Sequence, residues 1–168
     1  GQPVFTEYSG AMLRDIPVVD GGRELDGIPH ITRKRTREEL WSETIPLHPL
    51  AAHIYDGCAD IHYPIHSSPS FAKFVGLPGI IVQGTATLAY AATAVVNHEA
   101  GGDPGRLAEL DAMFVGMVRP GESVQLVVRE KEARGGAEDI HFDVLNSAGQ
   151  KAVTGGRVTA EVEREGLD

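Results

Sequence analysis

The amino-acid sequence predicts an α+β domain in which an antiparallel β-sheet packs around one long buried helix. Two observations carry this prediction: residues 84–99 are apolar on nearly every helical face, and four strand-like segments separated by turn residues follow them. A helix that is apolar all round is normally buried. A helix followed by consecutive strands is an α+β order, unlike the alternating order of parallel-sheet proteins. The length of 168 residues fits one domain with a substantial core.

The first thirty residues carry little patterning, and we interpret residues 1–30 as an N-terminal arm or linker and residues 31–168 as the domain. Residues 2–13 alternate weakly, which favours a strand or an extended arm. Glycines and a proline between residues 20 and 30 indicate a loop. Two interpretations stay open for this segment: a linker in front of the C-terminal half of a two-domain protein, or an arm that packs on a partner subunit.

Three short elements are expected before the long helix. Residues 31–37 alternate charged side chains with apolar side chains or Thr, which suggests a strand. A short helix is expected from residue 49 or 50 to Asp56, and a short amphipathic segment from Ser70 to Val75. The apolar side of the first of these helices would hold Ala51, Ala52 and Ile54.

After the long helix, which the glycine-rich segment 101–105 ends, the sequence predicts a meander of four strands. The strands are expected at residues 107–118, 123–133, 138–145 and 151–163. The turns between them are expected at residues 119–121, 134–136 and 146–149, where Gly, Pro, Asn and Ser cluster.

Composition excludes several classes of function. A net charge of −9 argues against general nucleic-acid binding, because phosphate contacts need clustered Lys and Arg. No apolar run reaches 18 residues, so no membrane span is expected. The first residues lack the basic and then apolar pattern of a secretory signal. The single cysteine, Cys58, cannot form an internal disulfide, which fits a reducing cytoplasm. We therefore expect a cytoplasmic protein.

The segment from Cys58 to Thr87 carries the strongest functional signal. Asp60, Pro64 and His66 stand close together in it, and an apolar run then leads to Gly84 at the start of the long helix. An imidazole titrates near neutrality, and a neighbouring carboxylate can orient it and share proton transfer. A backbone N–H at a helix N-terminus can bind a developing negative charge. The pattern favours acid/base chemistry beside the N-terminus of the long helix.

The order and spacing of these residues resemble the MaoC-like family, the (R)-specific enoyl-CoA hydratases and 3-hydroxyacyl dehydratases of the hot-dog fold. Pro64-Ile65-His66 matches the proline, aliphatic residue and histidine of the family motif, and Gly84 matches its later glycine. Phe71 and Ala72 fall in the helix between these two positions, and residues 114–123 (FVGMVRPGES) look like the family's strand–turn–strand element. The resemblance extends roughly over residues 31–162.

Three positions depart from the family pattern. Tyr63 stands where the family has Asn before the proline, and Gln83 stands where it usually has His before the glycine. Ile61 occupies the position of the family's acid, which leaves Asp60 one residue further from His66. Either the loop bulges so that Asp60 turns into the site, or the acid is missing and the chemistry is altered or lost.

The resemblance implies a lyase that hydrates 2-enoyl thioesters or dehydrates (R)-3-hydroxyacyl thioesters. His66 and Asp60 would share the acid/base work, and the N–H of Gly84 would bind the enolate oxygen. Tyr63, Ile65 and Gln83 are the expected substrate-binding residues. The implied partners are an acyl-CoA or acyl-carrier thioester and a second copy of the chain, as a homodimer or larger homo-oligomer. No cofactor is expected.

Other interpretations stay open. A hot-dog protein can also be an acyl-CoA thioesterase, or a non-catalytic or repurposed subunit that binds acyl thioesters or pairs with an active partner. His66 can be a turn histidine, Asp60 an N-cap or turn residue and Gly84 a packing glycine. His62 and His66 are four residues apart, but Pro64 interrupts a helix between them and no metal site is predicted.

Overall fold

A computed structural model describes most of the chain. The described residues are 2–11, 15–17, 19–21, 26–28 and 38–161. The chain divides into two compact units, residues 1–32 and 33–168. The described residues of the first unit contain no helix or strand, so the strand alternative for residues 2–13 is not found within residues 2–11. The strand predicted at residues 31–37 lies outside the described residues.

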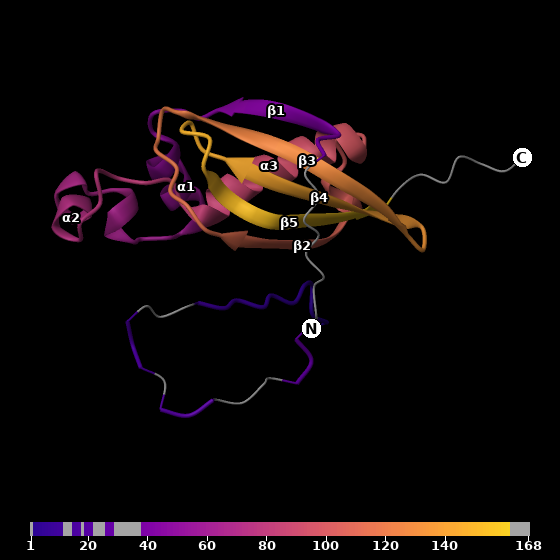
Figure 1. Cartoon of the computed structure of the whole chain (residues 1–168), viewed down its shortest axis with the longest axis horizontal. Coiled ribbons are helices and arrows are strands. Elements are labelled where there is room, and N and C mark those ends of the chain that lie inside the picture. Colours follow the sequence, from indigo (N-terminus) through magenta and orange to yellow (C-terminus); the bar gives the residue numbers. More distant parts are fainter. Residues whose placement is uncertain (1, 12–14, 18, 22–25, 29–37, 162–168) are drawn as a thin grey trace, which may run out of the picture. The chain divides into compact units, whose positions relative to one another are not determined.

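The second unit contains a five-stranded antiparallel sheet (Figure 1). Its strands are β1 (Trp41–Pro46), β2 (Leu107–Phe114), β3 (Ser123–Arg134), β4 (Ala137–Leu145) and β5 (Lys151–Glu161). Their order across the sheet is β1-β3-β4-β5-β2. Hairpins join β3 to β4 and β4 to β5, whereas β1 and β2 form the two edges.

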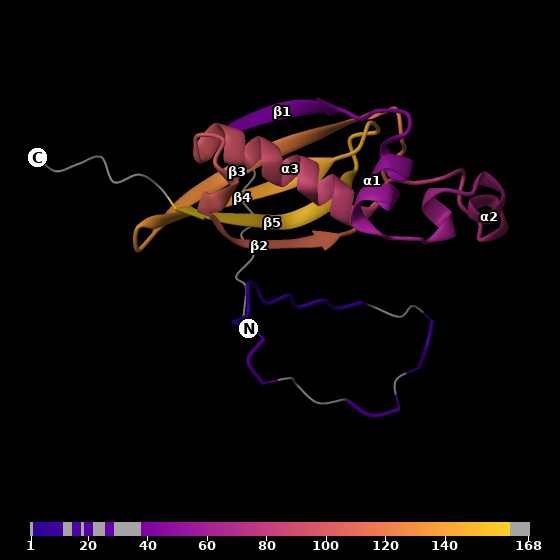
Figure 2. The ribbon, with the colours of Figure 1, turned by 180° about the vertical axis from the view of Figure 1, so that it is seen from behind.

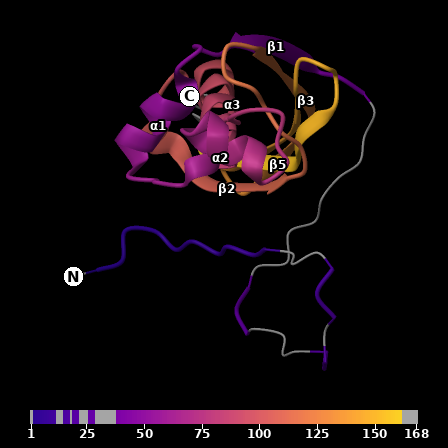
Figure 3. The same cartoon turned by 90° about the vertical axis from the view of Figure 1, so that its left-hand side faces the viewer.

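Among the described residues, five helical segments accompany the sheet. They are α1 (Ala51–Ala59), the 3₁₀ turn η1 (Pro64–His66), α2 (Pro69–Phe74), α3 (Gly84–Glu99) and the 3₁₀ turn η2 (Pro104–Arg106). Figure 2 shows α3 lying along one face of the sheet, and the end view in Figure 3 shows the strands curving around it. This arrangement confirms the predicted hot-dog fold. α1 and α2 gather at one end of the sheet, where α3 begins (Figure 2).

The core forms where α3 meets the concave face of the sheet. Small buried residues of α3 such as Ala91 and Val95 let the helix approach the strands closely. They pack with alternate residues of the central strands, which project to one face because side chains alternate along a strand. The strand residues of this cluster include Leu126, Val128, Ile140, Phe142, Val144, Val153 and Val158.

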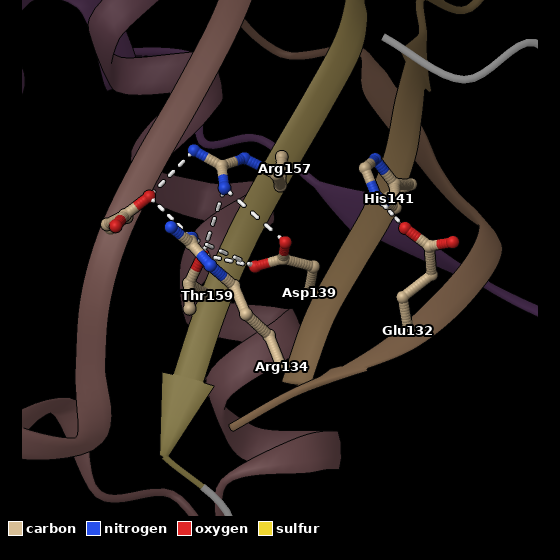
Figure 4. Close-up of polar contacts among 7 residues, drawn as sticks. Glu132, Arg134, Asp139, His141, Arg157 and Thr159 are labelled. Carbon is tan, nitrogen blue, oxygen red and sulfur yellow. Dashed lines mark hydrogen bonds and ion pairs between the residues drawn. The ribbon is translucent and has the colours of Figure 1, made fainter. Parts of the chain in front are cut away.

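The opposite face of the sheet carries a network of ion pairs at one end of the strands (Figure 4). Arg157 of β5 contacts Glu109 of β2 at 2.8 Å and Asp139 of β4 at 3.5 Å. Arg134 of β3 contacts Glu109 at 2.9 Å, and the hydroxyl of Thr159 donates a hydrogen bond to Asp139. Hydrogen bonding to Arg134 is the main reason why the pKa of Glu109 lies below its ordinary value. The network therefore links four strands electrostatically.

Several elements differ from the sequence prediction. β1 was not predicted, and the strand predicted at residues 107–118 ends at Phe114. That strand pairs with β5, so the four strands do not form a simple meander. Ile54 was expected on the apolar side of α1, but it is 52% exposed, while Ala51 and Ala52 are buried as expected.

The long helix also differs in one respect from its prediction. Its bounds agree, but α3 is not buried on every side. A narrow exposed stripe runs along it at intervals of four residues, which places these residues above one another on one helical face. The stripe consists of Thr85, Ala89, Thr93 and Asn97. Within the described part of the chain, no helix is long and apolar enough to cross a membrane.

Candidate active site

His66 is a buried residue whose ring orientation is fixed by a backbone contact. It ends η1, which starts at Pro64, and its Nδ1 lies 2.9 Å from the carbonyl oxygen of Ile81. A carbonyl oxygen only accepts hydrogen bonds, so Nδ1 carries the hydrogen in this contact. In the neutral ring Nε2 then holds the lone pair, and this atom is suited to take a proton.

Tyr63 and Ile65 flank this histidine along the chain. The Tyr63 ring meets the His66 ring edge to face at a centroid distance of 6.2 Å, and Tyr63 is 54% exposed. Ile65 is half-buried, and its carbonyl oxygen accepts a hydrogen bond from Ile81 N at 3.3 Å. Tyr63 thus contacts the imidazole while it stays exposed, and Ile65 helps to attach η1 to the segment that contains Ile81.

The segment 80–83 is the structural link between His66 and α3. His66 and Ile65 hold it at Ile81, and Val82 N donates to the carbonyl of Val118 at 2.8 Å. Its last residue, Gln83, is the N-cap position of α3. Ile81 also lines a pocket of about 220 Å³ together with Met117, Arg119, Asn146 and Gln150. One short piece of chain therefore joins the imidazole to the helix N-terminus, and of its residues Ile81 also lines the pocket.

The N-terminus of α3 begins at Gly84 without a side-chain cap from the described residues. The Gln83 carbonyl accepts hydrogen bonds from the backbone N and the hydroxyl of Thr87 at 3.0 and 3.2 Å, which starts the helical pattern. The ring of Phe114 lies against Gly84, because a methyl group at this position would come within 2.9 Å of the ring. Glycine allows this close approach, and the first-turn N–H groups of such a helix favour a negative ligand.

Asp60 lies apart from His66. It is the C-cap residue of α1, with a left-handed backbone at φ 54°, and its side chain is 93% exposed. Its carboxylate pairs with Nε2 of His62 at 2.8 Å. The structure brings His66 and Gly84 to the two ends of one segment but directs Asp60 to His62. The catalytic role of Asp60 stays a prediction.

A buried acid that sequence reasoning missed is Asp56 on α1. It is 8% exposed, and its Oδ1 accepts a hydrogen bond from Nε2 of Gln83. The same Nε2 donates to the carbonyl oxygen of Ala52 at 2.9 Å. The signal was available in the sequence, since Asp56 follows the apolar Ala52 by four residues and therefore shares its helical face. An acid on a buried helical face is a candidate for a functional role.

The described residues contain no group of three or more His, Cys, Asp and Glu side chains arranged to hold a metal ion. His62 and His66, which are four residues apart, point to different partners: Asp60 in one case and the Ile81 carbonyl in the other. The site consists of an imidazole, a helix N-terminus and a buried Gln–Asp pair.

Comparison with known proteins gives the family. Residues 33–152 match the profile of the MaoC like domain, and the chain belongs to the MaoC-like dehydratase family. It is 39% identical over 90 residues to a fatty acid synthase subunit beta of Aspergillus oryzae. It is 38% identical over 61 residues to the peroxisomal enoyl-CoA hydratase 2 of Arabidopsis thaliana. These matches involve 54% and 36% of the chain, respectively.

The relatives are much longer than the matched region, which spans 4% of the Aspergillus protein and 20% of the Arabidopsis protein. Among solved structures, a MaoC-like dehydratase from Phytophthora capsici superposes with a TM-score of 0.73 at 24% sequence identity. That superposition covers 85% of this chain and 48% of the other chain. At this identity the structural likeness establishes the fold, and the hot-dog architecture and the family agree with each other.

Proposed function

We propose that this chain catalyses the reversible hydration of 2-enoyl thioesters, or the dehydration of (R)-3-hydroxyacyl thioesters, with CoA or a carrier protein as the handle. The observation that carries the proposal is His66, whose Nδ1 is committed to the Ile81 carbonyl so that Nε2 holds the lone pair in the neutral ring. Membership of the MaoC-like dehydratase family and the similarity to a plant enoyl-CoA hydratase support the reaction class.

The imidazole of His66 takes part in the proton transfers of the proposed reaction. In dehydration, Nε2 of His66 takes the proton from C2 as electrons move towards the thioester carbonyl. The C3–O bond then breaks, the double bond forms between C2 and C3, and the hydroxyl takes a proton and leaves as water. Hydration is the reverse of these steps. Catalysis by one positioned acid/base group typically contributes about 10²- to 10⁴-fold in rate.

In both hydration and dehydration, the negative charge on the thioester oxygen needs a hydrogen-bond donor in a fixed position. The N–H of Gly84 is the proposed donor, because α3 begins there without a side-chain cap from the described residues and its dipole favours negative charge at this end. Loss of one such donor costs about 10²- to 10³-fold in kcat.

Two routes exist for the proton that reaches the departing hydroxyl. Asp60 is the predicted donor, which requires its carboxylate to leave His62 and turn towards the substrate. The protonated His66 is the other donor, since it can return the proton that it took from C2. The exposed position of Asp60 favours the second route. The variant Asp60→Asn separates them: unchanged turnover supports proton return by His66, and a loss as large as that of His66→Ala supports an acid/base pair.

The test is the loss of enoyl absorbance when crotonyl-CoA is hydrated. We expect wild-type turnover and a reduction of at least about 10²-fold in His66→Ala, from the loss of one acid/base group. His53→Ala is the matched control, because His53 is an exposed histidine on α1. Equal activity of His66→Ala and wild type would refute the assigned role of His66.

A binding subunit without hydratase activity is the second candidate. The half-buried Ile61 at the position of the family's acid, together with the exposed Asp60, favours it. This candidate predicts that the protein binds crotonyl-CoA in titration calorimetry but does not convert it. Release of free thiol from an acyl-CoA would instead indicate a thioesterase.

We further propose that the chain acts as a homodimer or larger homo-oligomer. Strand β2 is an edge of the sheet, and exposed apolar side chains gather on it and directly after it, at Leu110, Met113, Phe114, Val115 and Met117. An edge strand has unpaired backbone groups that a second strand can satisfy. Light scattering of the purified chain tests this point: a monomeric mass across the concentration range would contradict it.

A further inference from the structure

The amide group of Gln83 has a fixed orientation. Its Nε2 faces two acceptors, Oδ1 of Asp56 and the carbonyl oxygen of Ala52. An ionised carboxylate and a backbone carbonyl can only accept hydrogen bonds, so an oxygen in the place of Nε2 would be repelled by both. Asp56 and Ala52 thus determine which end of the amide carries the oxygen.

The oxygen of this amide, Oε1, is a buried hydrogen-bond acceptor whose capacity is not used. Gln83 is 2% exposed, and its Oε1 has no hydrogen-bond partner among the described residues. Leaving a buried carbonyl oxygen unpaired is unfavourable, and each such case in a native structure calls for an explanation. A donor from a ligand or from water at this place would satisfy it.

The position of Gln83 indicates which ligand can supply the donor. Gln83 stands directly before Gly84 and two residues after Ile81, to which His66 is bonded. Two residues of chain span at most about 7 Å, so the backbone of Gln83 lies close to both the contact with His66 and the start of α3. In the proposed reaction, only the water that is added, or the hydroxyl that it becomes, carries a hydrogen-bond donor at the reacting carbons.

We propose that Oε1 of Gln83 binds this water in the free enzyme and the 3-hydroxyl group in the hydroxyacyl thioester, and that Asp56 is the positioning residue that keeps Oε1 available. The inference rests on the proposed function, since it assigns the hydroxyl-binding contact of that same site. It also gives a role to Asp56, a buried acid that takes no part in the proposed acid/base steps. Substrates with a 3-hydroxyl are thereby distinguished from saturated thioesters of equal length.

The test compares two ligands that differ only in the hydroxyl group, (R)-3-hydroxybutyryl-CoA and butyryl-CoA. Titration calorimetry uses the His66→Ala protein, which keeps Asp56 and Gln83 but should convert the hydroxylated ligand at least about 10²-fold more slowly; His66→Gln serves if the alanine variant does not fold. The hydroxylated ligand is expected to bind about two- to tenfold more tightly, the range of one net hydrogen bond.

Variants then test whether the difference in affinity between the two ligands depends on the amide of Gln83. Adding Gln83→Leu should abolish the preference, because leucine has no acceptor for the hydroxyl group. The substitution also removes the two hydrogen bonds from Nε2 to Asp56 and Ala52, and the comparison of both ligands in the same variant separates that shared change from the loss of the hydroxyl contact. Asp56→Asn should reduce the preference, because an asparagine can donate to Oε1 and release the amide from its fixed orientation. Gln125→Leu is the matched control, since Gln125 is a glutamine on β3 that bonds to Ser42; it should leave the preference unchanged.

Equal affinities for the two ligands, or a preference that survives Gln83→Leu, would overturn the inference. Its failure is distinct from that of the proposed function. Crotonyl-CoA turnover by the wild-type chain without any preference for the hydroxylated ligand defeats the inference alone. A preference that depends on Gln83 in a chain without turnover supports the hydroxyl contact and defeats the proposed catalysis.

Discussion

Replacement of Gly84 by alanine should impair catalysis while sparing the fold. A methyl group at this position would lie 2.9 Å from Cγ and Cδ1 of Phe114, whereas ordinary contacts begin at 3.4 Å. The ring must therefore move by about 0.5 Å (3.4 − 2.9). Phe114 is 48% exposed and ends the edge strand β2, so it has room to move towards solvent.

The stability change should be small, because the displaced ring is half-exposed and because alanine is the better helix former. Glycine inside a helix costs about 0.5–1 kcal/mol relative to alanine, which offsets part of the strain. We expect a net change within about 1 kcal/mol. Activity should respond far more strongly, because the methyl group displaces the Phe114 ring beside the N–H and so changes the surroundings in which the thioester would meet the donor. If the donor is lost, kcat falls by about 10²- to 10³-fold.

The assay combines crotonyl-CoA hydration with urea unfolding of the same preparation. Gly57→Ala is the matched control: Gly57 lies inside α1, and a methyl group there would have nothing within 4 Å. This variant should keep its activity and unfold at equal or slightly higher urea concentration. A folded Gly84→Ala protein with wild-type kcat would refute the role of Gly84 as a donor approached closely by the thioester.

The remaining predictions concern stability and its pH dependence. In Gly156→Ala the new methyl would lie 2.4 Å from the ring of Phe142, a cross-strand partner that is only 2% exposed and cannot yield. Overpacking of this kind costs about 1–3 kcal/mol, which lowers Tm by about 2–12 °C at this chain length; an unchanged Tm by circular dichroism would contradict it. For Asp143, burial raises the pKa, but hydrogen bonds from Lys151 and Thr154 outweigh it and lower the pKa overall. Its stabilisation is therefore present above the unfolded-state pKa of about 4 and is lost as the pH falls through the folded-state pKa. Urea unfolding should show Asp143→Asn less stable than wild type at pH 7 and the gap closing towards pH 3, and a constant gap would disprove this.

Local signals explain which parts of the fold could be predicted from the sequence. The bounds of α3 agree with the prediction because the helix starts at Gly84 and ends before the glycines at 101 and 102, both of which adopt positive φ angles. The hairpin turns contain glycines with positive φ, including Gly135 and Gly149, and such positions are marked in a sequence by residue type alone. These features depend on a few adjacent residues.

The parts that could not be predicted depend on tertiary contacts. Strand β1 reads WSETIP, and its alternation is weak because Glu43 occupies the same face as Trp41 and Ile45. Its strand state follows from pairing with β3, which lies more than 70 residues away in the sequence. The position of β2 beside β5 likewise depends on long-range pairing and has no local signal.

In the candidate site, too, features set by adjacent residues could be predicted, whereas features set by tertiary contacts could not. The motif singled out His66 and Gly84, which the structure holds at the two ends of one segment because both belong to one continuous stretch of chain; their catalytic roles stay predictions. It could not show that the nearest acid in the motif, Asp60, caps α1 and faces solvent, because the left-handed turn at that residue follows from where the helix ends. It also could not show that Gln83, three positions beyond the apolar run's start, reaches back to Asp56 on α1.

Unused hydrogen-bonding capacity is the feature that would distinguish a working site from a purely structural one here. His66 and Gln83 are both buried, and each uses one end of its polar group to attach to the protein: Nδ1 to the Ile81 carbonyl, and Nε2 to Asp56 and Ala52. A structural role would be complete with these contacts. Each residue nevertheless has a second polar atom, Nε2 of His66 and Oε1 of Gln83, and these atoms are the acceptors that a C2 proton and a hydroxyl group would need. One donor, the Gly84 N–H, would complete the set that a 3-hydroxyacyl thioester requires, and all three groups are ones that the fold leaves available to a ligand.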